Sequence, residues 1–288
     1  MYQLAPLDAP APLQRLDPLT RGSLFHEIQT SFFRSLVAND MLPLTTARSA
    51  PARQMLEWAI GEITTQAYDD LAPAIDRVWK DEVDGLRRDL RLWLDQQLLP
   101  DAQRWLPQRF ELAFGLPLDA ARDAASAREP ARVGAAGYLL RGSIDLVERR
   151  SDGTHLRVTD HKTGKNRTTP ATIVDGGRVL QPVLYAVALE AITGQTVDEG
   201  RLSYCTAAGQ FTERTIVLDE HIRRRGVEVL EIIDRAVEHG MLAAKPGAPM
   251  GHPACDYCDF RPVCGPDEPS RTRRKPAVPD LDALRRMP

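Results

Sequence analysis

The sequence predicts an α/β protein in which a small mixed β-sheet is flanked by helices. Three observations lead to this fold class. Apolar residues recur at helical spacing through the first third of the chain, short apolar runs separated by Gly, Pro and Asp-Gly follow from about Phe110, and a cluster of cysteines lies near the end. A chain of 288 residues can bury a substantial core. We expect one α/β unit with a helical insertion.

The first part of the chain is predicted to be helical. Residues 1–20 are rich in Pro and Ala and are expected to form an extended lead-in. A helix should follow, because apolar side chains recur on one face at Leu24, Phe25, Ile28, Phe32 and Leu36. About residues 51–105 keep the helical period and form the expected insertion. Three of its tryptophans are expected to pack between helices: Trp58, Trp79 and Trp93.

The second part should form the sheet and its covering helices. After the strands that begin near Phe110, the predicted elements are a helix at Val179–Ala191, strands at Arg201–Thr206 and Phe211–Val217, and a helix at Glu220–Glu238. A cysteine loop is expected at 246–266, and a basic, mobile tail at 267–288.

Composition excludes several classes of protein. The net charge is −3, from 37 basic and 40 acidic residues, so the whole molecule is no polycation, although a local basic groove remains open. No apolar run approaches the ~20 residues that a membrane-spanning helix needs. The first residues lack the basic and apolar regions of a signal peptide. We therefore expect a cytoplasmic protein without a membrane segment.

The most informative stretch is a predicted hairpin around Asp152-Gly153, a dipeptide typical of two-residue turns. If these residues centre the turn, Asp145 and Asp160 lie at equal distances on either side of it. The two aspartates should then face each other, with Cβ atoms roughly 5 Å apart. A bulge at the turn would shift this register by one residue.

A pair of facing carboxylates is costly unless a cation lies between them. Like charges on neighbouring strands repel, whereas Mg²⁺ or Mn²⁺ would turn Asp145 and Asp160 into ligands. Lys162 leaves the same strand face as Asp160. Two carboxylates, a divalent cation and an ammonium are what phosphodiester hydrolysis requires. An isolated Asp-x-Lys on a strand is, however, common in proteins without this chemistry.

The cysteine loop carries a second candidate metal site. Cys255, Cys258 and Cys264 have the spacing C-x2-C-x5-C. One disulfide among three such thiols would leave the third unpaired, so a soft metal or a cluster is favoured. Zinc is the usual occupant of closely spaced cysteines.

Four motifs, in this order along the chain, resemble the RecB/AddB-type branch of the PD-(D/E)XK nuclease superfamily. They are R-G-S-L-F-H at 21–26, G-S-I-D at 142–145, V-T-D-H-K-T-G-K at 158–165, and Gln181 with Tyr185. The resemblance implies a restriction-endonuclease-like fold over 21–266.

The same resemblance assigns roles to individual residues. His26, Asp145 and Asp160 would hold the metal, and Lys162 would be the catalytic lysine. Gln181 and Tyr185 would hold or contact DNA near the site. Glu111 matches an acidic residue that the family often carries on the preceding strand. A histidine such as His26, outside this motif order, would more often be a packed core residue.

For the cysteines, the resemblance implies a [4Fe–4S] cluster in place of zinc. The family's fourth cysteine lies in a Cys-Pro segment upstream of the first motif, and this sequence has no cysteine before Cys205. We therefore expect an incomplete cluster and a chain that is a piece of a longer protein. Cys205 is the only alternative fourth thiol and matches an ordinary strand position.

The expected function is Mg²⁺- or Mn²⁺-dependent, exonuclease-type cleavage of DNA ends or single strands, with a helicase domain or subunit as partner. The chain has no G-x-x-x-x-G-K-[ST] motif, so it is not itself the motor. Two alternatives remain open: a catalytically inactive DNA-binding subunit with a nuclease fold, and a zinc-stabilised stand-alone enzyme of different chemistry.

Overall fold

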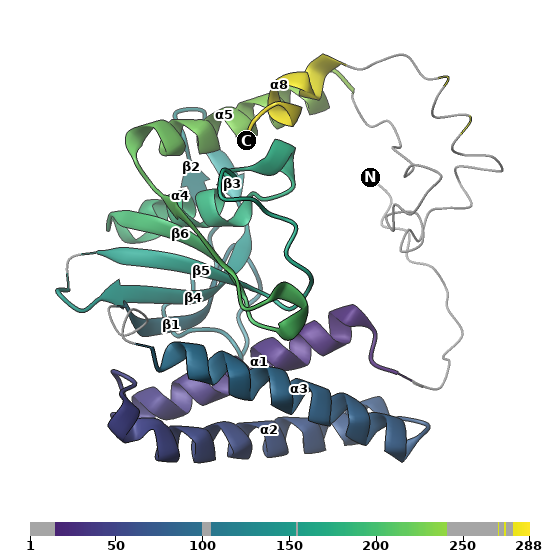
Figure 1. Cartoon of the computed structure of the whole chain (residues 1–288). Helices are drawn as coiled ribbons and strands as arrows, with labels where there is room; N and C mark the ends of the chain where they lie inside the picture. Colours follow the sequence, from purple (N-terminus) through teal and green to yellow (C-terminus); the bar gives the residue numbers. More distant parts are fainter. Residues whose placement is uncertain (1–14, 100–104, 154, 241–269, 271–273, 275–278) are drawn as a thin grey trace.

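A five-stranded mixed sheet lies between two layers of helices in the computed structural model of the chain (Figure 1). The structure describes residues 15–99, 105–153, 155–240, 270, 274 and 279–288. The strand order is β1-β4-β5-β6-β7; β5 and β6 run parallel, and the other neighbours are antiparallel. This arrangement confirms the predicted α/β class and is that of a restriction-endonuclease-like fold.

The main helices are α1 (Pro18–Ala38), α2 (Ser49–Leu71), α3 (Asp76–Gln97), α4 (Gln181–Thr193), α5 (Glu220–Glu238) and the short α8 (Asp282–Arg285). The sheet strands are β1 (Trp105–Phe114), β4 (Gly142–Arg150), β5 (Leu156–Lys162), β6 (Val197–Tyr204) and β7 (Glu213–Val217). A separate two-stranded hairpin, which was not predicted from the sequence, pairs β2 (Ala131–Val133) with β3 (Tyr138–Leu140).

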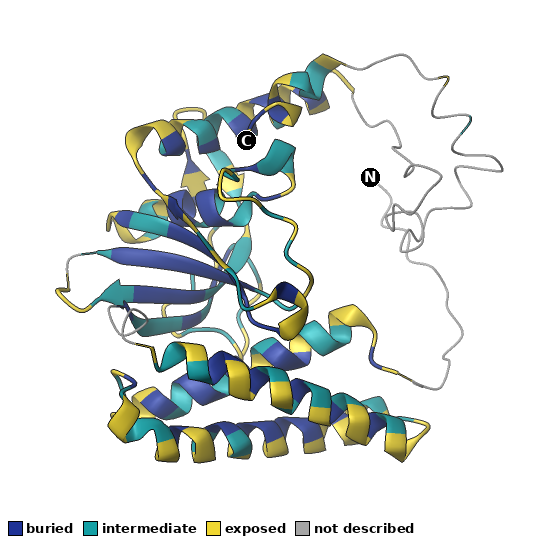
Figure 2. Ribbon diagram, in the orientation of Figure 1, coloured by how far each residue is buried: buried dark blue, intermediate teal, exposed yellow. Residues whose placement is uncertain are grey.

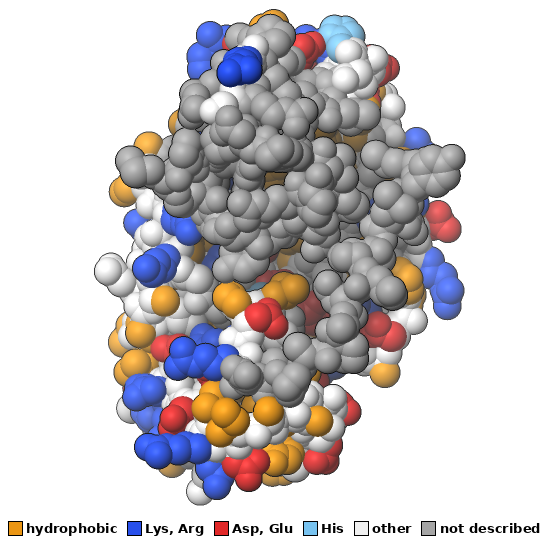
Figure 3. Space-filling view, turned by 90° about the vertical axis from the view of Figure 1, so that its right-hand side faces the viewer, with side chains coloured by type: hydrophobic (Ala, Val, Ile, Leu, Met, Phe, Trp, Pro, Cys, Tyr) orange, Lys and Arg blue, Asp and Glu red, His pale blue; other side chains and the backbone are white. Residues whose placement is uncertain are grey.

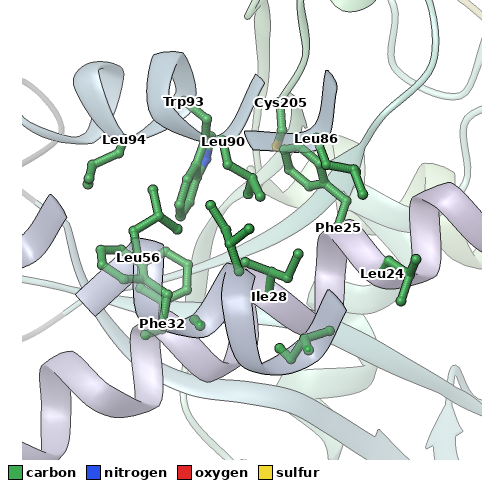
Figure 4. Packing of buried hydrophobic residues seen from close by; sticks show 14 of the residues in the cluster. Leu24, Phe25, Ile28, Phe32, Leu56, Leu86, Leu90, Trp93, Leu94 and Cys205 are labelled. Atoms are coloured by element: carbon green, nitrogen blue, oxygen red, sulfur yellow. The ribbon is translucent and has the colours of Figure 1, made fainter. Parts of the chain in front are cut away.

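Helices α1, α2 and α3 cover one face of the sheet (Figure 1). Their apolar stripes meet in a buried cluster (Figure 4). This cluster also includes Phe110 and Leu146 of the sheet. Trp93 is at its centre, with ring contacts to Phe32 and Phe33. The prediction for Trp58 was wrong: its side chain is 59% exposed, because it lies on the outer face of α2.

Helices α4 and α5 cover the opposite face and form a second buried cluster with the strands. Helix α4 connects the parallel strands β5 and β6, as a crossover between parallel neighbours must. Both faces are therefore covered, and the central strands are buried along most of their length (Figure 2).

The β4–β5 hairpin has the register that the sequence predicts. The last pairs of the ladder are Val147 with Val158 and Leu146 with Thr159. Continuing this register by one residue places Asp145 opposite Asp160. The turn contains Gly153 at a φ of +82°, a conformation that favours glycine. The two aspartates thus occupy facing positions on neighbouring strands.

A buried ion network stiffens the same hairpin. Glu148 accepts two hydrogen bonds from Arg157, at 2.8 Å each, and one from Thr159 at 2.6 Å. Arg201, on β6, donates to both carboxylate oxygens of Glu148. Burial alone would raise the pKa of Glu148, but the two guanidinium groups lower it to about 2. The network joins the side chains of β4, β5 and β6.

The last residues of the chain pack on the domain. Leu284 and Met287 are buried against the α5 side, and the Pro288 carbonyl oxygen accepts hydrogen bonds from the backbone N–H groups of Ile173, Val174 and Asp175. Residues 279–288 therefore differ from the mobile tail expected for them. The predicted cysteine loop lies outside the described residues.

The surface carries charges of both signs. Over the helical layer, at the bottom of the face in Figure 3, basic and acidic side chains are interspersed with hydrophobic ones. Within the described ranges, no helix combines the length and the apolar character needed to cross a membrane.

Candidate functional site

Three carboxylates from three adjacent strands gather at one end of the sheet. Glu111 lies on β1, Asp145 on β4 and Asp160 on β5. Ligand atoms of Glu111, Asp145 and the His26 imidazole all lie within 4.8 Å of one another. Asp160 is outside this group of three, although its position faces that of Asp145.

Helix α1 brings His26 to the carboxylates. His26 Nδ1 lies 3.6 Å from Asp145 Oδ2. The helix is fixed by Arg21, which donates to Asp89 of α3 at 2.8 Å, while Asp89 also accepts from the backbone N–H of Ala207. The R-G-x-x-x-H motif therefore has a structural basis, because its arginine ties α1 both to α3 and to the loop after β6.

The glycine of this motif allows α1 to approach the end of β5. A Cβ atom at Gly22 would lie 3.2 Å from Thr163 Oγ1, which is tighter than ordinary packing. Thr163 directly follows Lys162, so the close approach sets the distance between α1 and the Asp-x-Lys strand.

Asp145 is held in place and is costly to ionise. Its Oδ2 accepts a hydrogen bond from the backbone N–H of His161 at 2.7 Å. Burial raises the pKa of Asp145 well above its ordinary value, and the neighbouring Asp160 charge raises it further. Burial lowers the pKa of His26, so its imidazole is neutral near pH 7 and has a free lone pair for a cation.

Glu111 reaches the site through an irregular backbone. Its φ is +54°, and it has no partner in the β1–β4 register, although Phe110 and Leu112 on either side do. Phe110 packs in the helical-layer cluster, whereas Leu112 packs in the cluster on the opposite face. The strand therefore twists at Glu111, a local distortion of the kind that re-aims side chains at functional sites.

Arg122 and Ser143 hold the Glu111 carboxylate. Both donate to Oε2, at 3.1 Å and 2.9 Å respectively. Neither residue was predicted from the sequence. Alternation along β4 could have found Ser143, since it shares the strand face of Asp145, but Arg122 lies in a loop and gives no sequence signal.

Asp160 and Lys162 form an ion pair with 2.6 Å between Oδ2 and Nζ. Burial raises the pKa of Asp160, although the Lys162 ammonium opposes this effect. The Lys162 side chain is 35% exposed, so its ammonium stands at the edge of the site, where a ligand can reach it. The predicted shared face of these residues is confirmed.

Helix α4 contributes Gln181 and Tyr185. Gln181 is the first residue of the helix and lines a cavity together with Lys162. The Tyr185 ring packs edge-on against Phe114. Burial raises the pKa of Tyr185, and the charges of Asp160, Asp145 and Glu111 raise it further, so the phenol keeps its proton at neutral pH.

Cys255, Cys258 and Cys264 lie outside the described residues. Cys205 is fully buried in the helical-layer cluster (Figure 4), and its thiol donates to the Ser203 carbonyl. Burial raises its pKa to about 12, which disfavours the thiolate that binds metals. This environment is that of a core cysteine.

The side chains at the sheet end fit a divalent cation. The donor set is one imidazole and two half-buried carboxylates, and withdrawing a carboxylate from water is costly when no positive charge compensates it. Carboxylate oxygens suit Mg²⁺ and Mn²⁺, while the imidazole nitrogen is the softer ligand. The residues that would hold such an ion are His26, Glu111 and Asp145, with Asp160 beside them.

The fold and these side chains point to the PD-(D/E)XK nuclease superfamily. The family model for that superfamily matches residues 2–265, and the chain belongs to this family. PD-(D/E)XK nucleases generally use divalent metal ions.

A relative with a named activity is the CRISPR-associated exonuclease Cas4/endonuclease Cas1 fusion of Leptospira interrogans serogroup Icterohaemorrhagiae serovar Lai (strain 56601). It is 30% identical to this chain over 128 residues. The match covers 44% of this chain and 22% of the relative. The chain therefore spans less than a quarter of that protein's length.

Proposed function

We propose that this protein is an Mg²⁺- or Mn²⁺-dependent deoxyribonuclease that hydrolyses phosphodiester bonds at DNA ends or in single strands. One observation carries the proposal: ligand atoms of His26, Glu111 and Asp145 lie within 4.8 Å of one another, beside the Asp160–Lys162 ion pair. The exonuclease named in the Leptospira relative supports the exonuclease type.

Each side chain has a distinct task in this proposal. A divalent cation, when bound, would activate water and neutralise phosphate charge. Lys162 donates hydrogen bonds to a phosphate oxygen and stabilises the charge that develops there, while Asp160 holds its ammonium in position. The His161 backbone N–H fixes one oxygen of Asp145. Gln181 and Tyr185 position the DNA strand.

The first experiment is a cleavage assay on linear DNA with Mn²⁺, Mg²⁺ or EDTA. We expect cleavage with either metal, more with Mn²⁺ because of the imidazole ligand, and none with EDTA. Asp145→Asn should abolish cleavage. Asp123→Asn is the control and should retain cleavage, because the nearby Asp123 carboxylate accepts a hydrogen bond from the backbone N–H of Phe110. Equal cleavage by both variants would refute the proposed site.

The finer assignment is to the RecB/AddB-type, iron–sulfur-containing branch, acting in the cytoplasm with a helicase domain or subunit. The four ordered motifs and the C-x2-C-x5-C spacing support it. Cys255, Cys258 and Cys264 would then hold a [4Fe–4S] cluster, with zinc as the alternative. Anaerobic purification followed by iron and zinc analysis separates the two, and Cys258→Ser should lower the content of the metal found.

The environment of Cys205 favours a fourth ligand from elsewhere. Because its thiol is buried and hydrogen-bonded in the core, Cys205→Ser should leave the iron content unchanged. Loss of iron in that variant would make Cys205 a ligand.

A catalytically inactive DNA-binding subunit is the second candidate. The internal ion pair of Lys162 with Asp160 is the observation that favours it, since this pair satisfies the lysine without substrate. Binding of DNA without cleavage in either Mn²⁺ or Mg²⁺ would establish this alternative.

A further inference from the structure

A cavity of about 460 Å³ adjoins the carboxylate site. Lys162, which forms the ion pair with Asp160, is one of its lining residues, and Gln181 of α4 is another. The rest of the lining comes from the loop between β5 and α4 and from the end of β6. Its size lies within the range of pockets that enclose a small ligand.

The rim of this cavity is basic. Lys162, Lys165, Arg167 and Arg178 line it, against the single carboxylate of Asp175. Arg178 contacts Asp175 only at 3.5 Å and is 81% exposed. Lys165 and Arg167 are exposed and make no hydrogen bond or ion pair with any residue in the part of the chain that the structure describes. These cations are therefore available to an anionic ligand.

The floor of the cavity is apolar. Val179, Leu202 and Tyr204 form a hydrophobic cluster of their own, separate from the two clusters that hold the helices to the sheet. In the parallel β5–β6 register, Leu202 lies beside Asp160 and Tyr204 beside Lys162. The apolar floor is thus the direct lateral continuation of the carboxylate site.

We propose that this cavity is a subsite for one unpaired nucleotide next to the phosphate that is cleaved. Its phosphate contacts Lys165, Arg167 and Arg178, and its base lies on the floor of Val179, Leu202 and Tyr204. A basic rim over an apolar floor matches a nucleotide, which joins an anion to a flat, weakly polar ring. The lining offers a single apolar cluster, on which one exposed base can lie, so the subsite favours a single strand or a frayed end.

This inference rests on the proposed nuclease function and adds to it the residues that determine substrate specificity. The first test measures binding of a fluorescein-labelled oligothymidylate by anisotropy in EDTA, so that no cleavage interferes. Arg167→Ala and Arg178→Ala should each weaken affinity about fivefold near 0.1 M salt and lower the salt slope by roughly 0.7. Arg77→Ala, an exposed arginine on α3 that does not line the cavity, is the matched control.

The second test leaves the protein unchanged and alters the ligand. Oligonucleotides that lack one base at a single position, counted from the end, are compared with the intact strand. We expect one position at which the missing base weakens binding by about fivefold to a hundredfold, because only one base lies on the apolar floor. A blunt, closed duplex should bind more weakly than the single strand.

The subsite is refuted if Arg167→Ala and Arg178→Ala bind like Arg77→Ala, if no base position matters, or if the closed duplex binds as well as the single strand. The cleavage assay is read separately. If the protein binds as predicted but does not cleave with Mn²⁺, the subsite is supported and the proposed nuclease function is refuted. If the protein cleaves DNA but the variants bind as well as the wild type, only the subsite is refuted.

Discussion

Removal of the Glu148 carboxylate should destabilise the protein far more than removal of an exposed partner in the same network. Glu148 is 3% exposed and receives hydrogen bonds from Arg157, Arg201 and Thr159. A pKa lowered from 4.5 to about 2 corresponds to about 3 kcal/mol of preference for the ionised form in the folded state. Glu148→Gln leaves two buried guanidinium groups without that charge, so we expect a loss of about 3 kcal/mol.

Urea unfolding at pH 7 measures this loss, with a shift of the midpoint and an unchanged slope. Glu213→Gln is the control, because Glu213 contacts Arg201 at 2.6 Å but is 47% exposed, and should cost at most about 1 kcal/mol. The direction in which this stabilisation changes with pH follows from the lowered pKa of Glu148. The stabilisation is complete above pH 4.5, the ordinary value, and is lost as the pH falls towards 2.

Wild type and Glu148→Gln should therefore converge in stability in acid, provided that both remain folded there. An equal loss for Glu148→Gln and Glu213→Gln at pH 7, or a gap that stays constant as the pH falls, would refute the reasoning.

Lys162→Ala should lower cleavage by about a hundredfold or more, because the ammonium acts on developing charge, while single-strand affinity in the anisotropy assay falls no more than about fivefold. Asp145→Asn should be as stable as wild type or more so at neutral pH without metal, since the raised pKa of Asp145 makes its ionisation oppose folding as the pH rises. Saturating Mn²⁺, at about a hundred times its Kd, should stabilise wild type by about 2.7 kcal/mol in thermal melts and leave this variant unchanged. Gly22→Ala should reduce cleavage without lowering the melting temperature, because the new Cβ meets Thr163 Oγ1, and the double variant with Thr163→Ala should recover activity.

Much of the fold could be predicted from local pattern. The Asp152-Gly153 turn set the hairpin register, and helix α5 was predicted with the bounds that the structure shows, because Asp219 caps it and its apolar stripe is regular. Trp58 shows where local pattern fails: its position in a helix was right, but which helix face meets a partner depends on packing.

The candidate site was less accessible to sequence reasoning. Asp145, Asp160 and Lys162 follow from a turn and from strand alternation, whereas the approach of His26 depends on the contact of Arg21 with Asp89 across the helical layer. The left-handed backbone of Glu111 reverses the side-chain alternation of β1 and so defeats any argument from the strand period. Arg122 and the loop cations of the cavity come from irregular segments, for which no period exists.

The contact between His26 and Asp145 has a consequence for the order in which the molecule matures during synthesis. His26 leaves the ribosome more than a hundred residues before Asp145 does. Helices α1, α2 and α3 can associate early, since their contacts are close in sequence, but the proposed metal ligands come together only when β4 and β5 dock against α1. The proposed hydrolytic centre would therefore be absent from a nascent chain until most of the sheet has been made, and unfinished polypeptides should show no cleavage of nucleic acid.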